Sequence, residues 1–283
     1  MDKKELAIFA AQIRLTTLEE FAHYGGGHIG GAMSLVETLA ALYGGQLAHK
    51  PEEPDWSERD RLVLSKGHAG PVLYAALALR GFFDVEMLKT LNKPGTNLPS
   101  HCDARKTPGV DMTTGSLGQG LSCGVGIALG RRMDELDYVT YVIVGDGEMD
   151  EGQNWEALMS AAHFGLDHLI IFCDRNKKQL DGYTRDIMEL GRLKEKFEAF
   201  GCHVQEVDGH AVSDIDAAIA CAKQVKNAPA VIILDTVKGK GCTFSETVEN
   251  NHHQFFTAEE MDLAIKAAEK ALEKAKGGGT SCV

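Results

Sequence analysis

The sequence lacks an excess of basic residues. Its 283 residues include 29 Lys and Arg against 41 Asp and Glu, which gives a formal net charge of −12. An acidic chain is a poor match for nucleic acid or for an anionic membrane surface. We therefore expect neither partner, and we expect any phosphate ligand to be held locally by metal ions and helix N-termini.

The sequence also lacks long apolar runs, a C-x-x-C motif and internal repeats. No apolar run approaches the length that spans a bilayer, and the acid-containing N-terminus MDKKELAIFAAQ is unlike a signal peptide. Seven widely spaced cysteines, an odd number, argue against a disulfide framework or a zinc site. We expect buried free thiols, among them Cys123, Cys173 and Cys221, and a reducing cytoplasmic location.

The most informative stretch is residues 138–182. Its predicted elements are, in order, a β-branched strand at 138–144, a Gly-Asp-Gly break at 145–147, a helix at 148–164 and an apolar strand at 168–173. A strand–helix–strand unit is a right-handed crossover, so the carboxyl ends of both strands lie at one edge of the sheet. Asp146 and Asn176 follow these two ends, where open α/β sheets bind ligands.

Asp146 and Asn176 offer oxygen ligands. A carboxylate, an amide oxygen and a backbone carbonyl are hard ligands, which suit Mg²⁺ or Ca²⁺ better than Zn²⁺. A Mg²⁺ ion with few protein ligands usually completes its shell with phosphate oxygens and water. Gly-Asp-Gly is also an ordinary turn, which leaves a purely structural interpretation open. The combined arrangement of strand, Gly-Asp-Gly, helix, strand and Asn favours a Mg²⁺–diphosphate site.

Helical and strand patterns alternate along the rest of the chain. Besides the elements above, we predict helices at 2–24, 34–44, 71–79, 117–132, 190–200, from 213 and at 257–276, and strands at 61–65, 203–207 and 230–237. Residues 92–116, 183–189 and 239–251 have the composition of loops. Capping-box patterns at 34–37, 213–216 and 257–260 mark three of the helix starts.

This alternation predicts an α/β fold with a doubly wound, mostly parallel sheet flanked by helices. Because no interdomain linker is visible, we expect one domain over residues 1–276. The remaining residues, 277–283, have the composition of a disordered tail.

Six short motifs connect the chain to a known family. They are GGGHIGGAMS at 25–34, LSKGHAG at 64–70, TTGSLGQGLS at 113–122, VGDGEMDEG at 144–152, DRNKKQLDG at 174–182 and TVKGKG at 236–241. Each motif alone is modest, but six in order over most of the chain are highly specific. The chain resembles the N-terminal half of a transketolase, a member of the thiamine diphosphate enzyme superfamily, which implies the thiamine diphosphate-binding fold.

The resemblance implies thiamine diphosphate and Mg²⁺ as cofactors, with Ca²⁺ or Mn²⁺ able to replace Mg²⁺. It assigns the metal to the side chains of Asp146 and Asn176 and to the main-chain carbonyl of Lys178, whose side chain must then point outward. The other cofactor contacts that it implies are His68, Gly115, Leu117, Gly147, Glu148 and His252.

The resemblance also implies a catalytic set: His28, His68, His101, Glu151 and His252. In this assignment His28 contacts substrate hydroxyls, His68 faces the diphosphate and His101 binds the sugar near its reacting carbonyl. Glu151 joins a network of acids that links two active sites across a dimer interface. Without the resemblance, each histidine is as well explained as a surface or core residue, and Glu151 as a favourable acid in a first helical turn.

The chain departs from the family pattern at several of these positions. Cys102 and Asp103 stand where the family usually has Pro and Glu, and His253 stands where it has Gly. The sequence leaves open whether His252 or His253 is the functional histidine. It also leaves open whether the lysines at 238 and 240 are solvated charges or screen phosphate.

The implied activity is the transfer of a two-carbon ketol unit from a ketose (phosphate) to an aldose (phosphate), as in the pentose phosphate pathway. In transketolases the Glu that activates the cofactor and the residues that grip the sugar phosphate lie in later domains, and this chain ends before them. We therefore expect a split transketolase, in which this chain needs a C-terminal, pyrimidine-binding partner subunit in an α₂β₂ assembly.

Two alternatives stay open at this point. One is the diphosphate-binding subunit of another thiamine diphosphate enzyme, of the 2-oxoacid dehydrogenase or deoxyxylulose-phosphate synthase type. The other is a non-catalytic binding module of the same fold. The histidines at 28, 68 and 101 favour sugar chemistry, and the intact pair Asp146 and Asn176 argues against a non-catalytic module.

Overall fold

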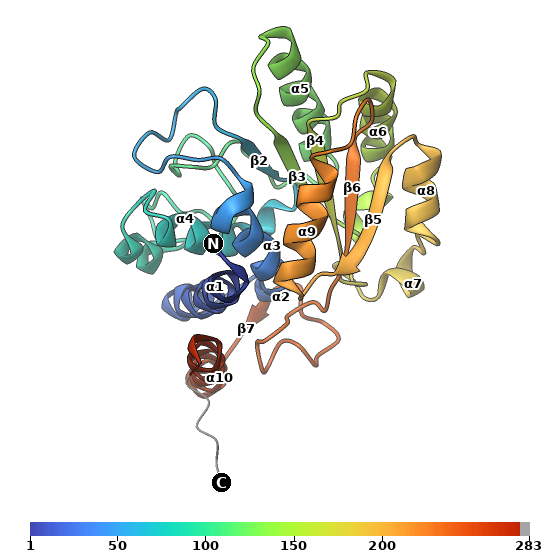
Figure 1. The fold of residues 1–283 in the computed structure, drawn as a ribbon. Coiled ribbons are helices and arrows are strands. Elements are labelled where there is room, and N and C mark those ends of the chain that lie inside the picture. The colour runs from blue at the N-terminus through green and yellow to red at the C-terminus, as the bar shows by residue number, and fades with distance from the viewer. Residues whose placement is uncertain (278–283) are drawn as a thin grey trace.

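A five-stranded parallel sheet lies at the centre of the protein (Figure 1). The computed structural model describes residues 1–277, so the predicted tail, apart from Gly277, lies outside the described residues. The strand order is β2-β3-β4-β6-β5, and every neighbouring pair is parallel. The strands are β2 (Arg61–Leu64), β3 (Thr140–Gly145), β4 (Leu169–Arg175), β5 (His203–Asp208) and β6 (Ala230–Asp235). The strands predicted from the sequence are confirmed.

Helices cover both faces of the sheet, which confirms the predicted doubly wound architecture. On one face lie α1 (Lys3–Tyr24), α2 (Ile29–Met33), α3 (Val36–Ala41), α4 (Gly70–Leu79) and α9 (Val212–Ala222), with α10 (Ala258–Lys276) packed against α1. On the other face lie α5 (Gln119–Met133), α6 (Gly152–His163) and α8 (Leu193–Ala199). Because side chains alternate along a strand, Tyr141 and Ile143 join the first core, whereas Val142 and Val144 join the second.

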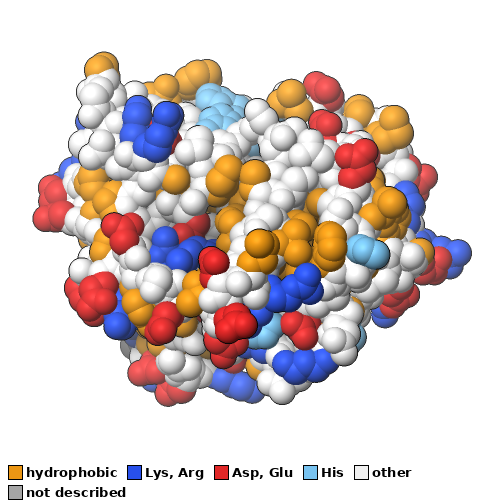
Figure 2. Space-filling model, turned by 90° about the horizontal axis from the view of Figure 1, so that it is seen from above, with side chains coloured by type: hydrophobic (Ala, Val, Ile, Leu, Met, Phe, Trp, Pro, Cys, Tyr) orange, Lys and Arg blue, Asp and Glu red, His pale blue; other side chains and the backbone are white. Residues whose placement is uncertain are grey.

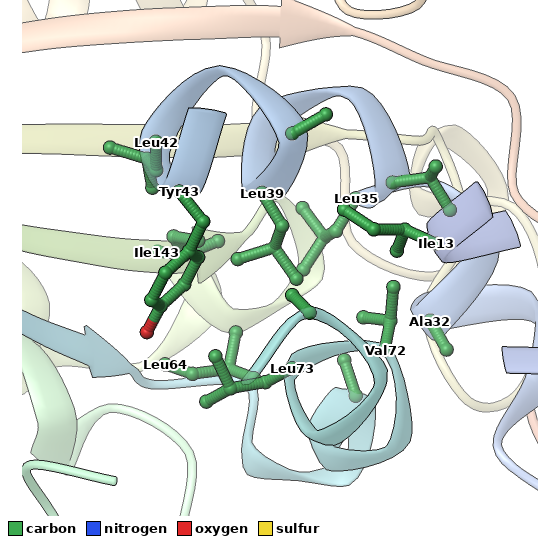
Figure 3. Close-up of a cluster of buried hydrophobic side chains, with 14 of the residues drawn as sticks. Ile13, Ala32, Leu35, Leu39, Leu42, Tyr43, Leu64, Val72, Leu73 and Ile143 are labelled. Carbon is green, nitrogen blue, oxygen red and sulfur yellow. The ribbon is translucent and has the colours of Figure 1, made fainter. Parts of the chain in front are cut away.

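The larger core fills the space between one face of the sheet and the helices that cover it, α1–α4 and α9, and it extends to α10. Figure 3 shows Leu35 and Leu39 above Leu73 of α4, and Leu42 to the left of them on the same side as Ile143 of the sheet. All five side chains are essentially inaccessible to solvent. Burying one such side chain stabilises the fold by about 1.5–3 kcal/mol. This packing fixes the turns that follow β2 and precede α3, and both turns contribute to the site described below.

A short antiparallel ribbon joins the two ends of the chain. β1 (Gly26–Gly27) pairs with β7 (Gln254–Phe255), with Gly26 opposite Phe255. A Cβ atom on Gly26 would lie 2.7 Å from Phe255 Cδ1 and 3.0 Å from the carbonyl oxygen of Gln254, so the two segments approach each other closely. The ribbon holds the residues just after Gly27 beside the residues just before Gln254.

Several short elements differ from the sequence-based expectations. Residues 183–189, predicted as a loop, contain the one-turn helix α7 (Thr184–Ile187). The predicted helix at 148–164 is divided into a 3₁₀ turn, η4 (Gly147–Asp150), and α6, because the extended backbone of Glu151 separates them. The remaining short helical elements are η1 (Leu42–Gln46), η2 (Gly67–Ala69) and η3 (Val85–Thr90).

Two of the three predicted capping boxes are wrong. The Ser34 hydroxyl donates to the buried Asp174 carboxylate instead of capping α3, and Glu37 pairs with Arg14 on α1. Helix α9 starts one residue before Ser213, with Ala211 as its N-cap and no side-chain cap. The third capping box, at the start of α10, is confirmed: Thr257 and Glu260 make the reciprocal bonds.

The cysteines among the described residues are free, as expected, but not all of them are buried. Cys102, Cys173, Cys202 and Cys242 are buried, whereas Cys123 is half-buried and Cys221 is exposed on α9. The expectation of a buried thiol is therefore wrong for Cys221, because it lies on the helix face that points away from the sheet. Within residues 1–277, no helix is long and apolar enough to cross a membrane.

The outer surface carries charges of both signs. On the face shown in Figure 2, hydrophobic side chains gather near the middle, while acidic and basic side chains alternate around them. Exposed large hydrophobic side chains of the whole described chain include Leu180, Met188 and Phe255.

Candidate active site

A cavity of about 240 Å³ opens at the carboxyl ends of β3 and β4, and both Asp146 and Asn176 line it. Asp146 starts the 3₁₀ turn after β3, and Asn176 directly follows β4. The Asp146 carboxylate accepts hydrogen bonds from the backbone N–H groups of Gly147, at 2.9 Å, and Lys177, at 2.7 Å. The two residues singled out from the sequence are thus brought to one cavity, as the strand–helix–strand unit predicted.

The surroundings of Asp146 suit a divalent cation. The side chain is buried, and burial together with the nearby Asp174 carboxylate raises the pKa of Asp146 to about 7. Because burial disfavours the charged form of this carboxylate, a positive charge bound beside it would stabilise that form. The amide oxygen of Asn176 offers a second hard ligand. No three His, Cys, Asp or Glu residues of the part described are placed to hold a metal ion. The predicted set has only one carboxylate, so the Mg²⁺ site stays a prediction.

Lys178, the predicted carbonyl ligand, also lines the cavity. Its ammonium group donates a 2.7 Å hydrogen bond to the Val248 carbonyl and lies 5.1 Å from the centre of the Tyr183 ring. The side chain is therefore engaged with residues that do not line the cavity, as a ligand role for its carbonyl requires.

Two buried ammonium groups line the same cavity. Lys66 follows β2 and Lys238 follows β6, and both are almost inaccessible to solvent. Burial, with the Lys66 charge nearby, lowers the pKa of Lys238 to about 8, and its ammonium group donates to the Gln179 carbonyl at 3.3 Å. Lys238 is thus no solvated surface charge, whereas Lys240 pairs with Glu246 at the partly exposed surface. Two buried cations make this end of the cavity suitable for an anion.

A cluster of histidine rings continues from the cavity toward the surface. His68 and His252 line the cavity with their ring centres 4.8 Å apart, and His28 lies 5.4 Å from the first and 5.3 Å from the second. The ring centre of His28 lies 5.4 Å from His101 and 4.8 Å from His253, and both of these are exposed. The structure therefore brings together all four predicted histidines, and of the pair 252 and 253 only His252 lines the cavity.

The pKa values of four of these imidazoles, those of His28, His68, His101 and His252, are lowered, which favours their neutral form. Burial is the largest cause and the positive groups around them add to it: the pKa of His28 falls to about 4 and that of His252 to about 3. The pKa of His68 is lowered well below its usual range by burial and by Lys66, and burial also lowers the pKa of His101. A neutral imidazole offers one donor and one acceptor, which matches the dual character of a sugar hydroxyl.

Glu148 lines the cavity, but its carboxylate is directed at the protein. It accepts hydrogen bonds from Ser65 and from the backbone N–H groups of Gly118 and Gly145, the latter two at 3.0 Å each. Burial raises the pKa of Glu148. The side chain therefore ties the 113–118 loop and the ends of β2 and β3 together around the cavity, and a direct cofactor contact stays a prediction.

Of the other predicted site residues, three line the cavity and one does not. Gly147, Leu117 and Glu151 line the cavity, and Glu151 is exposed as the N-cap of α6. Gly115 lies outside the lining and packs on His101, where an added Cβ would come within 3.0 Å of the ring. No described contact tests the predicted network of Glu151 across a dimer interface, which stays a prediction.

Comparison with known proteins shows the family to which the chain belongs. Residues 6–272 match the family model described as transketolase, thiamine diphosphate binding domain. The chain belongs to the transketolase family. The match spans every predicted site residue, from His28 to His252, so the predicted resemblance is confirmed.

Two similar relatives of this transketolase chain are named as subunits. It is 55% identical over 258 residues to the 6-deoxy-6-sulfo-D-fructose transketolase subunit SqwG of Clostridium sp. (strain MSTE9), covering 91% of this chain and 94% of the relative. It is 38% identical over 248 residues to a protein of Phocaeicola vulgatus named as a subunit of apulose-4-phosphate transketolase, covering 88% of each.

Solved structures show the same fold in longer chains. A transketolase mutant of Pichia stipitis in complex with fructose 6-phosphate superposes with a TM-score of 0.84 at 30% identity. The similarity covers 98% of this chain but only 45% of the Pichia chain. This transketolase chain thus spans under half the length of that enzyme.

Sequence reasoning missed one group of residues in this transketolase site. The Asp174 carboxylate is completely buried and accepts from Asn176, Ser34, Lys66 and Thr236. A usable signal was present, because residues two apart on a strand point to the same side, which puts Asp174 beside Asn176. The other three partners, Ser34, Lys66 and Thr236, come from distant segments, so no local sequence pattern predicts that they meet Asp174.

Proposed function

We propose that this chain is the diphosphate-binding subunit of a two-subunit transketolase that transfers a two-carbon ketol unit from a ketose to an aldose. The observation that carries the proposal is the meeting of Asp146 and Asn176 in one cavity whose wall continues into the His68, His252 and His28 rings.

The residues present fit Mg²⁺ and thiamine diphosphate. Asp146, Asn176 and the carbonyl of Lys178 would hold the metal, while Lys66 and Lys238 would lie close to the diphosphate oxygens. Bound thiamine diphosphate supplies a nucleophilic carbon that allows the ketose C2–C3 bond to break and retains the two-carbon fragment for the acceptor. The chain's own contribution is to anchor, orient and exclude water.

The histidines provide the polar contacts of the reaction chamber. Because His28 and His252 are neutral near pH 7, each can accept a hydrogen bond from a sugar hydroxyl or donate one to it without a change of charge. The rings of His101 and His253 lie beside His28 at the surface, and in this proposal His101 meets the sugar near its reacting carbonyl. The same cluster has no evident use in a non-catalytic module.

A second subunit supplies the rest of the site in this proposal. Two relatives that match this chain over nearly their whole length are named as transketolase subunits, whereas the Pichia chain is more than twice as long. We infer a pyrimidine-binding partner, in an α₂β₂ assembly, that covers the exposed mouth of the cavity. A cytoplasmic location belongs to the same proposal.

We propose the substrate from the names of the relatives and from the histidine cluster. A sulfonated ketose, 6-deoxy-6-sulfo-D-fructose, is the first donor to assay, because the relative of 55% identity carries that name. Ketose phosphates, which the sequence resemblance implied, and apulose 4-phosphate, after the second relative, are the comparison donors. The relatives' names thus favour these sugars over the pentose phosphate pathway expected from the sequence.

The test is to assay ketol transfer with this chain alone, with the candidate partner alone and with the two mixed, in thiamine diphosphate and Mg²⁺. We expect activity only in the mixture, and loss of that activity in a mixture that contains Asp146→Ala. Full activity from this chain alone would refute the two-subunit arrangement. An active mixture that does not respond to Asp146→Ala would refute the assignment of the site.

A further inference from the structure

Asp174 connects four separate segments of the chain at the base of the cavity. It lies in β4, completely buried, and forms an ion pair with Lys66 from the β2–η2 turn. It also accepts hydrogen bonds from Ser34 Oγ between α2 and α3, at 2.7 Å, and from Thr236 Oγ1 after β6. Such a set of donors around the two oxygens is how proteins retain a buried carboxylate.

The fourth donor is the side chain of Asn176, whose Nδ2 donates to Asp174 Oδ2 at 2.9 Å. An amide has an acceptor end and a donor end, and either could face the cavity. An ionised carboxylate accepts hydrogen bonds only, so Asp174 bonds the NH₂ end of Asn176 and leaves its oxygen for another partner. That oxygen accepts a 3.2 Å hydrogen bond from the backbone N–H of Lys178, on the side of the predicted metal ligands.

Asp174 also places the charge of Lys66. The Lys66 side chain lines the cavity with 2% of its surface exposed, and Asp174 is its ion-pair partner. One carboxylate therefore contacts both the predicted metal ligand Asn176 and Lys66, which we proposed above to lie close to the diphosphate. A purely structural ion pair between β2 and β4 would require no bond to Asn176.

We propose that Asp174 is a positioning residue that turns the amide oxygen of Asn176 toward the bound divalent cation and holds Lys66 against the anionic side of the ligand. The inference rests on the proposed function, because it needs a metal–diphosphate complex in this cavity. Asp174 does not itself touch the metal in this proposal. Exchanging the acid at position 174 with the amide at position 176 tests its role.

The test measures the affinity of Mn²⁺ in the presence of thiamine diphosphate by electron paramagnetic resonance, with no assay of activity. Removing a group that orients a metal ligand typically weakens metal binding about 10–100-fold. We therefore expect Asp174→Asn to weaken Mn²⁺ binding by at least about tenfold. Thr236→Val, which removes a donor to Asp174 but leaves the Asn176 bond, is the matched control and should bind Mn²⁺ nearly as the wild type does.

The decisive variants exchange the two side chains. Asn176→Asp places a carboxylate against Asp174, and we expect it to weaken Mn²⁺ binding although a carboxylate is itself a good ligand. The double variant Asp174→Asn with Asn176→Asp restores an acid–amide pair and the same net charge, and should recover most of the lost affinity. Since Asn176→Asp and the double variant carry the comparison, the test stands even where Asp174→Asn alone does not fold.

Two results separate this inference from the proposed function. If the wild type binds Mn²⁺ with thiamine diphosphate but Asn176→Asp binds as tightly or more tightly, the positioning role is wrong and the metal site stands. If the double variant shows no recovery over Asn176→Asp, the positioning role is wrong as well. If the wild type binds neither ligand even when it is mixed with its partner subunit, the proposed function fails and the inference fails with it.

Discussion

The backbone N–H of Lys177 donates a 2.7 Å hydrogen bond to the carboxylate of Asp146, and it does so from a left-handed backbone with φ of +67°. The side chain of Lys177 points elsewhere and pairs with Asp235 at 2.6 Å. A left-handed conformation costs a residue with a Cβ about 1–2 kcal/mol. The turn that approaches Asp146 is thus strained in this chain.

This strain predicts an inverted order of stability between glycine and alanine at position 177. Both Lys177→Gly and Lys177→Ala lose the pair with Asp235, but only glycine relieves the left-handed backbone, so it should be more stable by about 1 kcal/mol. The measurement is denaturant unfolding. At Lys194, an exposed position in α8, alanine should instead be the more stable by about 1 kcal/mol. Alanine proving the more stable at 177 would contradict the account.

The close approach of Gly30 to the loop before His252 gives a second prediction. A Cβ atom on Gly30 would lie 2.1 Å from the carbonyl oxygen of Asn251, whereas a Cβ on Gly152 at the start of α6 would meet nothing within 4 Å. Gly30→Ala should destabilise the protein by about 1–3 kcal/mol, because backbone must move. Gly152→Ala should be neutral or stabilising by up to about 1 kcal/mol. Equal unfolding midpoints for the two variants would show that the loop is not packed on α2.

The histidine cluster predicts a loss of stability in mild acid. The pKa values of His28 and His252 lie below the usual value of 6.5 in the folded protein. Above pH 6.5 these histidines are neutral in the folded and in the unfolded chain. As the pH falls from 6.5 toward about 4, the unfolded chain binds protons first, so the free energy of unfolding declines. Unfolding measured at several pH values should show a shallower decline in His28→Gln than in the wild type. His203→Gln, at an exposed position on β5, should leave the decline unchanged.

Glu20 on α1 predicts the opposite pH dependence. Its carboxylate is buried, neither oxygen has a hydrogen-bond partner among the described residues, and burial raises its pKa well above 4.5. The folded state therefore prefers the protonated acid, so the free energy of unfolding should fall as the pH rises above 4.5.

Glu20→Met removes the buried acid and should raise the free energy of unfolding at pH 8 by about 1–3 kcal/mol. Its advantage over the wild type should shrink toward pH 4.5, where the wild-type acid is increasingly protonated in both states. Glu259→Met, at an exposed position near the start of α10, is the control. A constant difference between Glu20→Met and the wild type at all pH values would exclude a buried, titrating Glu20.

The fold and the central pair were predictable because their signals are local. A β-branched run, a Gly-Asp-Gly break and a second apolar run define β3, β4 and the places of Asp146 and Asn176 without any long-range information. The roles of the histidines were predicted only from the resemblance, because a lone histidine between glycines can equally be a surface or a core residue. The structure adds that their rings touch one another.

The parts that could not be predicted depend on distant partners. Ser34 has the sequence pattern of a helix cap, yet its hydroxyl bonds Asp174, 140 positions away in the chain. The sequence left open whether Lys238 is a solvated charge, and the structure shows it buried, with its ammonium group beside His252 from the loop that follows. In both cases a polar side chain satisfies a buried group that tertiary packing brings near, and no pattern within a few residues encodes that choice.

The most direct test of the central claim is calorimetric titration of the protein with thiamine diphosphate in excess Mg²⁺. The wild type and Asp181→Ala, an exposed acid close in the chain, should bind with the same affinity. Asp146→Ala should bind at least about tenfold more weakly, since it removes the buried carboxylate that we propose as a ligand of the cation. Equal affinity in all three proteins, or no binding by the wild type, would contradict the account.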